Sequence, residues 1–197
     1  CQADAAIVTL GDRIDAETIH AATRLKILAN YAVGYNNINL AAARQRGLIV
    51  TNTPDVLTDA TADMTWALLL ATARRIVEGD VLVRSGRWTG WSPTQLLGAE
   101  VSGKTLGIIG MGRIGQAVAQ RAVGFRMPVR YHTSHPPATS TPPCEWEHRS
   151  LRDLLGEADI VTIHIPYSRE THHAVGAPEI ALMKNRRSSS MPPGVGW

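Results

Sequence analysis

Short apolar runs alternate with helix-like segments over the first part of the chain. Three runs have the length of buried β-strands, at residues 5–10, 25–29 and 48–51. Two segments of helical composition lie between them, at residues 15–22 and 38–46. This β-α-β-α-β order predicts parallel strands joined by crossover helices.

A longer helical pattern follows at residues 59–83, where Met64 and Leu68 begin a series of apolar side chains near helical spacing. Residues 85–98 are rich in Gly, Trp and Pro, which is typical of a loop. We therefore expect residues 59–98 to form one helix and a linking loop between two domains.

A second alternation of strands and helices begins near residue 104. Its strand-like runs lie at residues 105–109, 129–132 and 160–165, and its helical segments at residues 113–123, 150–155 and 178–183. The four prolines of residues 135–143 predict a loop. Residues 99–184 therefore predict an α/β fold with a Rossmann-type doubly wound parallel sheet.

The strongest chemical signal is a G-x-G-x-x-G pattern at Gly110, Gly112 and Gly115. It follows an apolar strand and opens a helix, which is the context that makes this pattern specific. Gly110 permits a tight turn, Gly112 lets a pyrophosphate approach the backbone, and Gly115 lets the helix pack closely on the strand. The pattern predicts a dinucleotide site, and a glycine-rich turn without a ligand is the alternative.

The second strand of this predicted domain leads into His132, Thr133, Ser134 and His135. A carboxylate that binds the adenosine ribose 2′-hydroxyl is usual about 20 residues after the glycine pattern. No Asp or Glu lies between Glu100 and Glu145, so nothing there repels a 2′-phosphate. The sequence leans toward NADP, and NAD stays open because residues 131–143 contain no Arg or Lys.

Composition narrows the class of protein. The 197 residues are 44% apolar, which is ordinary for a globular protein, and the net charge of +3 comes from scattered basic residues. Scattered charge favours a solvated surface over a nucleic-acid site. The longest apolar run, near residues 66–73, is too short to span a membrane. Two cysteines make no disulfide framework, so we expect a cytoplasmic protein, and no Cys/His spacing predicts a metal site.

Several stretches closely resemble the D-2-hydroxyacid dehydrogenases, and the glyoxylate/hydroxypyruvate reductases in particular. They include residues 30–38 (NYAVGYNNI), 50–54 (VTNTP), 57–63 (LTDATAD) and 164–173 (HIPYSRETHH). With the glycine pattern, the resemblance extends from about residue 2 to residue 184.

The resemblance implies an NAD(P)-dependent enzyme that reduces a small 2-oxo acid by hydride transfer. It implies a partial flavodoxin-like substrate domain at residues 1–58 and a dinucleotide-binding domain at residues 99–184. It also implies a homodimer formed through the helix at residues 59–83.

The resemblance further implies site residues. The backbone N–H groups of Val33 and Gly34 would hold the substrate carboxylate. The other implied contacts are with the cofactor: Gly112, Arg113 and Ile114 at the pyrophosphate, Thr133, Ser134 and His135 at the adenosine 2′ position, and Pro166 near the nicotinamide ribose. Relatives that prefer NADP often have Arg in place of Ser134.

The family's catalytic Arg, Glu and His are expected after the strand that follows residue 184. Residues 185–197 resemble nothing in the family, and the sequence begins with Cys1. We therefore expect a fragment that lacks catalytic residues and is inactive as written. The histidines that are present do not replace them: His132 and His135 lie at the adenosine end, and the others fit packing or surface roles.

The genetic code offers an explanation for the unusual tail. Codons for residues 185–197, read from the third base of the Asn185 codon, permit Pro-Thr-Val-Leu-Val-Asn-Ala-Ala-Arg-Gly-Gly-Val. That is the strand and Arg-Gly turn expected in the family. Our hypothesis is a single-base frameshift near Asn185, with residues 185–197 as a non-native tail. The alternatives are a dehydrogenase-like corepressor that binds the dinucleotide without turnover, and a non-functional remnant.

The frameshift hypothesis predicts that DNA beyond codon 184 continues, in another frame, into an Arg-Gly turn, a Glu-bearing loop and a Pro-His motif. Sequencing about 400 bases past this point tests it. An undisturbed frame with no family-like continuation would rule the frameshift out.

Overall fold

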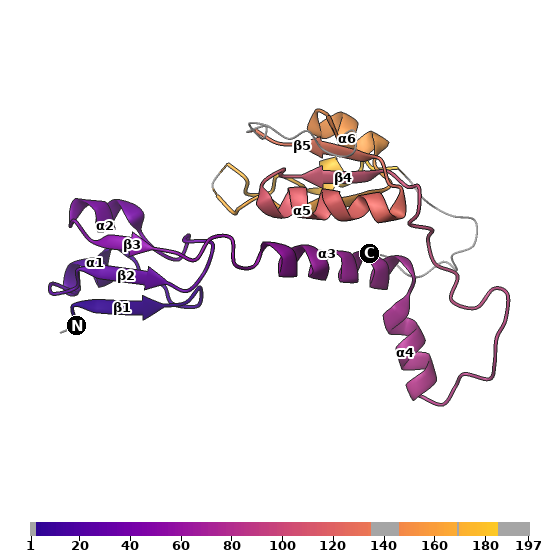
Figure 1. Cartoon of the computed structure of the whole chain (residues 1–197), viewed down its shortest axis with the longest axis horizontal. Helices are drawn as coiled ribbons and strands as arrows, with labels where there is room; N and C mark the ends of the chain where they lie inside the picture. Colours follow the sequence, from indigo (N-terminus) through magenta and orange to yellow (C-terminus); the bar gives the residue numbers. More distant parts are fainter. Residues whose placement is uncertain (1–2, 135–145, 169, 185–197) are drawn as a thin grey trace. The chain divides into compact units, whose positions relative to one another are not determined.

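The computed structural model describes residues 3–134, 146–168 and 170–184. It contains two parallel sheets, each within its own compact unit (Figure 1). The first unit comprises Cys1–Thr58 and Pro166–His172, and the second comprises Asp59–Ile165 and His173–Trp197. The expected α/β fold with parallel strands is therefore confirmed. His135, the proline-rich residues 135–143 and the tail at residues 185–197 lie outside the described residues.

The first unit has the order β1-β2-β3, with two connecting helices. Its elements are β1 (Ala5–Val8), α1 (Ala16–Ala21), β2 (Ile27–Asn30), α2 (Leu40–Gln45) and β3 (Ile49–Thr51). Both helices begin at a polar cap, where Asp15 accepts from the Thr18 N–H and Asn39 from the Ala42 N–H, each at 3.0 Å. Gly47, with φ of +68°, follows α2 and ends it.

Only one face of this sheet is covered by the described residues. Leu28 on β2 packs with Ile19 of α1 and with Ala42 and Ala43 of α2, and each of these side chains is buried. The opposite face carries Ile7, which is 81% exposed, and Ile49, which is 59% exposed. Parallel sheets in globular proteins normally have both faces covered.

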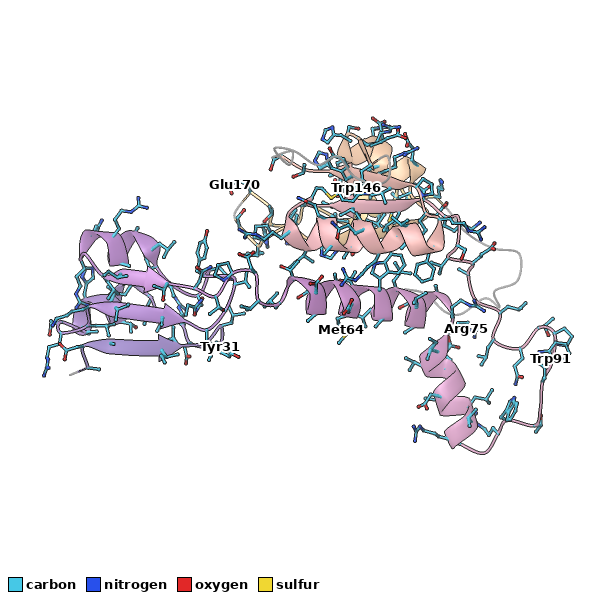
Figure 2. The ribbon with its side chains drawn as sticks, in the orientation of Figure 1. Tyr31, Met64, Arg75, Trp91, Trp146 and Glu170 are labelled. Atoms are coloured by element: carbon cyan, nitrogen blue, oxygen red, sulfur yellow. The ribbon has the colours of Figure 1, made fainter. Side chains whose placement is uncertain are left out.

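The expected single helix at residues 59–83 is wrong in one respect, because the structure divides it. α3 (Thr58–Ala73) ends at a bend, and α4 (Ile76–Arg84) begins beyond Arg75, which has a left-handed φ of 54° (Figures 1 and 2). The Ala73 carbonyl, which a continuous helix would use internally, instead accepts from the Ala99 N–H at 2.7 Å. The hydrogen bond between this helical carbonyl and the loop at Ala99 explains the break.

The second unit has the sheet order β6-β5-β4-β7. Its strands are β4 (Leu106–Ile109), β5 (Val129–His132), β6 (Trp146–His148) and β7 (Ile160–Ile163), all parallel. The connecting helices are α5 (Arg113–Ala122), the short 3₁₀ helix η1 (Val123–Phe125) and α6 (Leu151–Glu157), followed by α7 (Ala177–Ile180). α7 ends earlier than the predicted helix at residues 178–183.

Strand β6 was not predicted, because a three-residue Trp-Glu-His segment has no apolar run. It pairs in parallel with β5, and ion pairs join it to its surroundings as well. Arg130 of β5 contacts Glu147 of β6 at 2.7 Å and Glu157 of α6 at 3.1 Å. Arg149 pairs with the same two glutamates. The four charged side chains form a network that links β5, β6 and α6.

Both faces of the second sheet are covered. One face packs against α3 and α5, with Leu106, Ile108 and Val118 fully buried, and the other packs against α6 through Leu154 and Leu155. This two-sided packing is the doubly wound arrangement that the sequence predicted. Within the described residues, no helix is long and apolar enough to cross a membrane.

Trp66 anchors α3 to this core. Its ring stacks on Phe125 with centroids 4.6 Å apart, and its indole N–H donates to the Val118 carbonyl at 3.1 Å. We predict that Trp66→Ala lowers the free energy of unfolding of the second unit by about 3–5 kcal/mol, because it leaves a cavity. Urea unfolding followed by circular dichroism measures this loss.

The matched control is Trp91→Ala, because the Trp91 side chain is 82% exposed (Figure 2). That change should move the free energy of unfolding by less than about 0.5 kcal/mol. Equal losses for the two variants would contradict the role assigned to Trp66.

Candidate dinucleotide and substrate sites

The glycine turn lies at the carboxyl end of β4, the strand at which the sheet order reverses. β4 pairs with β5 on one side and with β7 on the other, and the chain reaches these two neighbours by separate crossovers. In open α/β sheets, ligands bind outside the carboxyl ends of the strands at such a switch point. The topology therefore places Gly110 and the residues after it at the position where this fold binds ligands.

Two of the glycines are required by close backbone contacts. Gly110 has φ of +96°, and a Cβ atom there would lie 2.6 Å from the His164 carbonyl oxygen. A Cβ atom at Gly115 would lie 2.2 Å from the Gly110 carbonyl oxygen. Neither contact can be relieved by a side-chain rotation, because both partners are backbone atoms.

Gly112 differs from the other two glycines. It is the N-cap of α5 with φ of −75°, and a Cβ atom there would have no neighbour within 4 Å. Having no side chain, it also makes no cap hydrogen bond to the first turn of α5. The helix dipole and the N–H groups of this turn can therefore attract an anion, and no acidic residue of the first turn opposes it.

The carboxyl end of β5 lies beside this turn. The Gly110 N–H donates to the His132 carbonyl at 2.8 Å, which ties the two strand ends together. The His132 ring is held by the Arg149 carbonyl, 3.0 Å from Nδ1, so that nitrogen carries the proton. Thr133 and Ser134 follow His132 directly, which places them at the end of the second strand, where Rossmann folds read the ribose.

The carboxyl end of β7 contributes His164, whose N–H donates to the Ile109 carbonyl at 2.7 Å. Its Nε2 lies 2.9 Å from the Thr162 hydroxyl. Burial lowers the pKa of the His164 imidazole below its ordinary value, which favours the neutral form. Pro166 belongs to the first unit, where its carbonyl accepts from the Thr171 hydroxyl at 2.7 Å.

The first unit holds the loop that contains Val33 and Gly34, after the carboxyl end of β2. Asn52 donates to the Val33 carbonyl at 2.9 Å, and Asn30 donates to the Gly34 carbonyl at 2.7 Å. Sequence reasoning missed these two asparagines. The available signal was their position at the ends of β2 and β3, because side chains at the carboxyl ends of parallel strands meet at one edge.

Comparison with known proteins decides the family. Residues 66–188 match the family model described as D-isomer specific 2-hydroxyacid dehydrogenase, NAD binding domain. The chain belongs to the D-isomer specific 2-hydroxyacid dehydrogenase family. It is 51% identical over 185 residues to glyoxylate reductase of Thermococcus kodakarensis, covering 92% of this chain and 56% of that protein. The chain thus spans about half the length of the curated relatives it matches.

Solved structures agree with this assignment. D-lactate dehydrogenase from Aquifex aeolicus, complexed with NAD and lactic acid, has a TM-score of 0.84 and 30% identity, covering 93% of this chain and 54% of that one. An acyclic imino acid reductase in complex with NADPH and D-Arg has a TM-score of 0.82 and 30% identity, covering 92% and 57%. Related structures thus hold NAD in one case and NADPH in the other.

The contrast between the glycines gives a test of the turn. Gly115→Ala forces a Cβ atom against the Gly110 carbonyl, so we predict a loss of about 1–3 kcal/mol in the free energy of unfolding. Gly112→Ala meets open space at an allowed φ, so its effect should stay below about 0.5 kcal/mol. Chemical denaturation of both variants measures the difference. A Gly115→Ala protein as stable as wild type would show that this helix start is not closely packed.

Proposed function

We propose that the whole protein is an NAD(P)H-dependent reductase of a small 2-oxo acid, of the glyoxylate or hydroxypyruvate type. The observation that carries this proposal is the start of α5, which has no side-chain cap and follows β4 at the switch point of the second sheet. The sequence identity of 51% to a glyoxylate reductase supports it. The cofactor supplies the hydride, and the protein orients both reactants.

The roles of the chain's residues follow from their positions. Gly110 and Gly115 shape the turn, while Gly112, Arg113 and Ile114 bring the first N–H groups of α5 to the pyrophosphate. The remaining contacts are proposed from the family pattern: Thr133, Ser134 and His135 at the adenosine 2′ position, Pro166 near the nicotinamide ribose, and Val33 and Gly34 at the substrate carboxylate.

We propose that the catalytic Arg, Glu and His lie outside this chain. The chain alone therefore binds the cofactor and does not turn over the substrate. A 2-oxo acid needs a cation to orient it and an acid to protonate the developing alkoxide. In this reading, residues 1–58 are part of the substrate domain, residues 59–98 link the domains, and residues 99–184 bind the dinucleotide.

A homodimer through α3 and α4 is also part of the proposal. These helices expose a series of large apolar side chains: Met64, Leu68, Ile76, Val77, Val81 and Val83. Met64 lies on the side of α3 away from α5 (Figure 2). Exposed apolar patches of this kind are typical of protein interfaces.

We propose that the nucleotide site prefers NADPH, because no carboxylate follows β5 to repel a 2′-phosphate. We predict that Thr133→Asp weakens NADPH binding at least tenfold and leaves NADH binding within about threefold, since the new carboxylate faces the 2′ position. Ser134→Arg should strengthen NADPH binding and spare NADH, because guanidinium groups pair with phosphate. Titration calorimetry with both nucleotides measures these constants.

The same titrations test the site itself. Gly112→Ala, which keeps the fold, should weaken both nucleotides together, because its methyl group meets the pyrophosphate. Binding of neither nucleotide to the wild-type chain would overturn the dinucleotide site. Reduction of glyoxylate by the chain as written would overturn the proposed absence of catalytic residues.

A further inference from the structure

Four consecutive carbonyl groups of the loop after β2, from Ala32 to Tyr35, each accept a hydrogen bond. The Ala32 carbonyl accepts from the Thr53 N–H at 2.9 Å, and the Tyr35 carbonyl from the Ile38 N–H at 3.1 Å. Between them, the Val33 and Gly34 carbonyls accept from Asn52 and Asn30. The orientations of these four peptide groups are therefore each set by a hydrogen bond.

The N–H groups of the same loop are not used in this way. In the part of the chain that the structure describes, no acceptor takes the N–H of Val33, Gly34 or Tyr35. In a planar trans peptide the carbonyl and the following N–H point in opposite directions. A carbonyl held by a side chain on one side therefore turns the next N–H to the other side.

Each asparagine controls one of these N–H groups. Asn52 holds the Val33 carbonyl and so directs the Gly34 N–H away from itself. Asn30 holds the Gly34 carbonyl and so directs the Tyr35 N–H in the same manner. These two successive N–H groups, here called the donor set, have no acceptor among the described residues and are available to the two oxygens of a carboxylate.

We infer that Asn30 and Asn52 are positioning residues, which orient the Gly34 and Tyr35 N–H groups toward the carboxylate of the 2-oxo acid. This inference rests on the proposed function, and it adds the side chains that orient the donors, with Tyr35 as a further donor. An amide is suited to the task, because it donates to a carbonyl and adds no negative charge beside the substrate.

The anchoring of Asn30 supports this role. Its side chain is almost completely buried, with the residue 1% exposed, and its Oδ1 accepts from Asn37 Nδ2 at 3.2 Å. Asn37 Nδ2 also lies 3.0 Å from the Thr9 carbonyl, at the end of β1. The donor set is thereby fixed to two strands of the sheet, which is how a rigid scaffold orders a binding loop.

The test uses Asn52, because its side chain is exposed and its replacement leaves the core intact. Nuclear magnetic resonance follows the amide proton signals of Gly34 and Tyr35 while oxamate, a stable analogue of a 2-oxo acid, is added to the full chain. In the wild type both signals should move. In Asn52→Ala the dissociation constant should rise about fivefold, which corresponds to one net hydrogen bond.

The matched control is Asn36→Ala, an exposed asparagine of the same loop whose side chain holds none of these carbonyls. Its dissociation constant should stay within twofold of wild type. A direct readout is the Val33 carbonyl ¹³C signal without ligand, which should move in Asn52→Ala and not in Asn36→Ala.

The outcomes separate the inference from the proposed function. If the wild-type amide signals move and the Asn52→Ala titration matches wild type, the positioning role is overturned and the substrate site stands. If oxamate moves neither signal in the wild type, the Gly34 and Tyr35 N–H groups of this chain do not bind a carboxylate, and the inference is overturned. An unmoved Val33 carbonyl signal in Asn52→Ala also overturns the positioning role.

Discussion

The second unit depends on the contact of backbone with backbone around Gly110. The Gly110 N–H donates to the His132 carbonyl at the end of β5, and the His164 carbonyl, just after β7, lies where it would clash with a Cβ atom at position 110. Gly115 brings the start of α5 against the same residue. Any side chain at Gly110 or Gly115 separates these elements, so the sheet, the helix and the helix start that we propose binds the cofactor share one steric requirement.

Local rules predicted much of this fold. Apolar runs located most strands, and the glycine pattern located the start of α5. The helical segments predicted at residues 15–22 and 150–155 begin at Asp15 and Ser150, which are the N-caps of α1 and α6. Long-range contacts account for the failures. The helix breaks at Arg75 where the Ala73 carbonyl accepts from Ala99, far along the chain, and β6 pairs with β5 and forms an ion pair with Arg130 of that strand. Hydrophobic periodicity contains no information about such partners.

The site shows the same division. The glycines can be proposed as site residues because their spacing is itself the signal, and the loop at Val33 and Gly34 because it resembles a family pattern. Asn30 and Asn52 were missed, because an asparagine near a strand end has many ordinary roles in turns. Only the hydrogen bonds to the Val33 and Gly34 carbonyls distinguish these two side chains. A role that consists of orienting another group is visible only in three dimensions.

One face of the first sheet is left uncovered by the described residues, and this affects how the chain will behave in solution. Ile7 and Ile49 expose branched apolar side chains on this face, which is a surface that attracts an apolar partner. Self-association of the isolated chain can therefore arise at this sheet as easily as at α3 and α4. A measured molecular mass above that of the monomer would therefore not show which of the two surfaces forms the contact. Polar substitutions at Ile7 and Ile49 must first remove the contribution of the sheet before a dimer is attributed to α3 and α4.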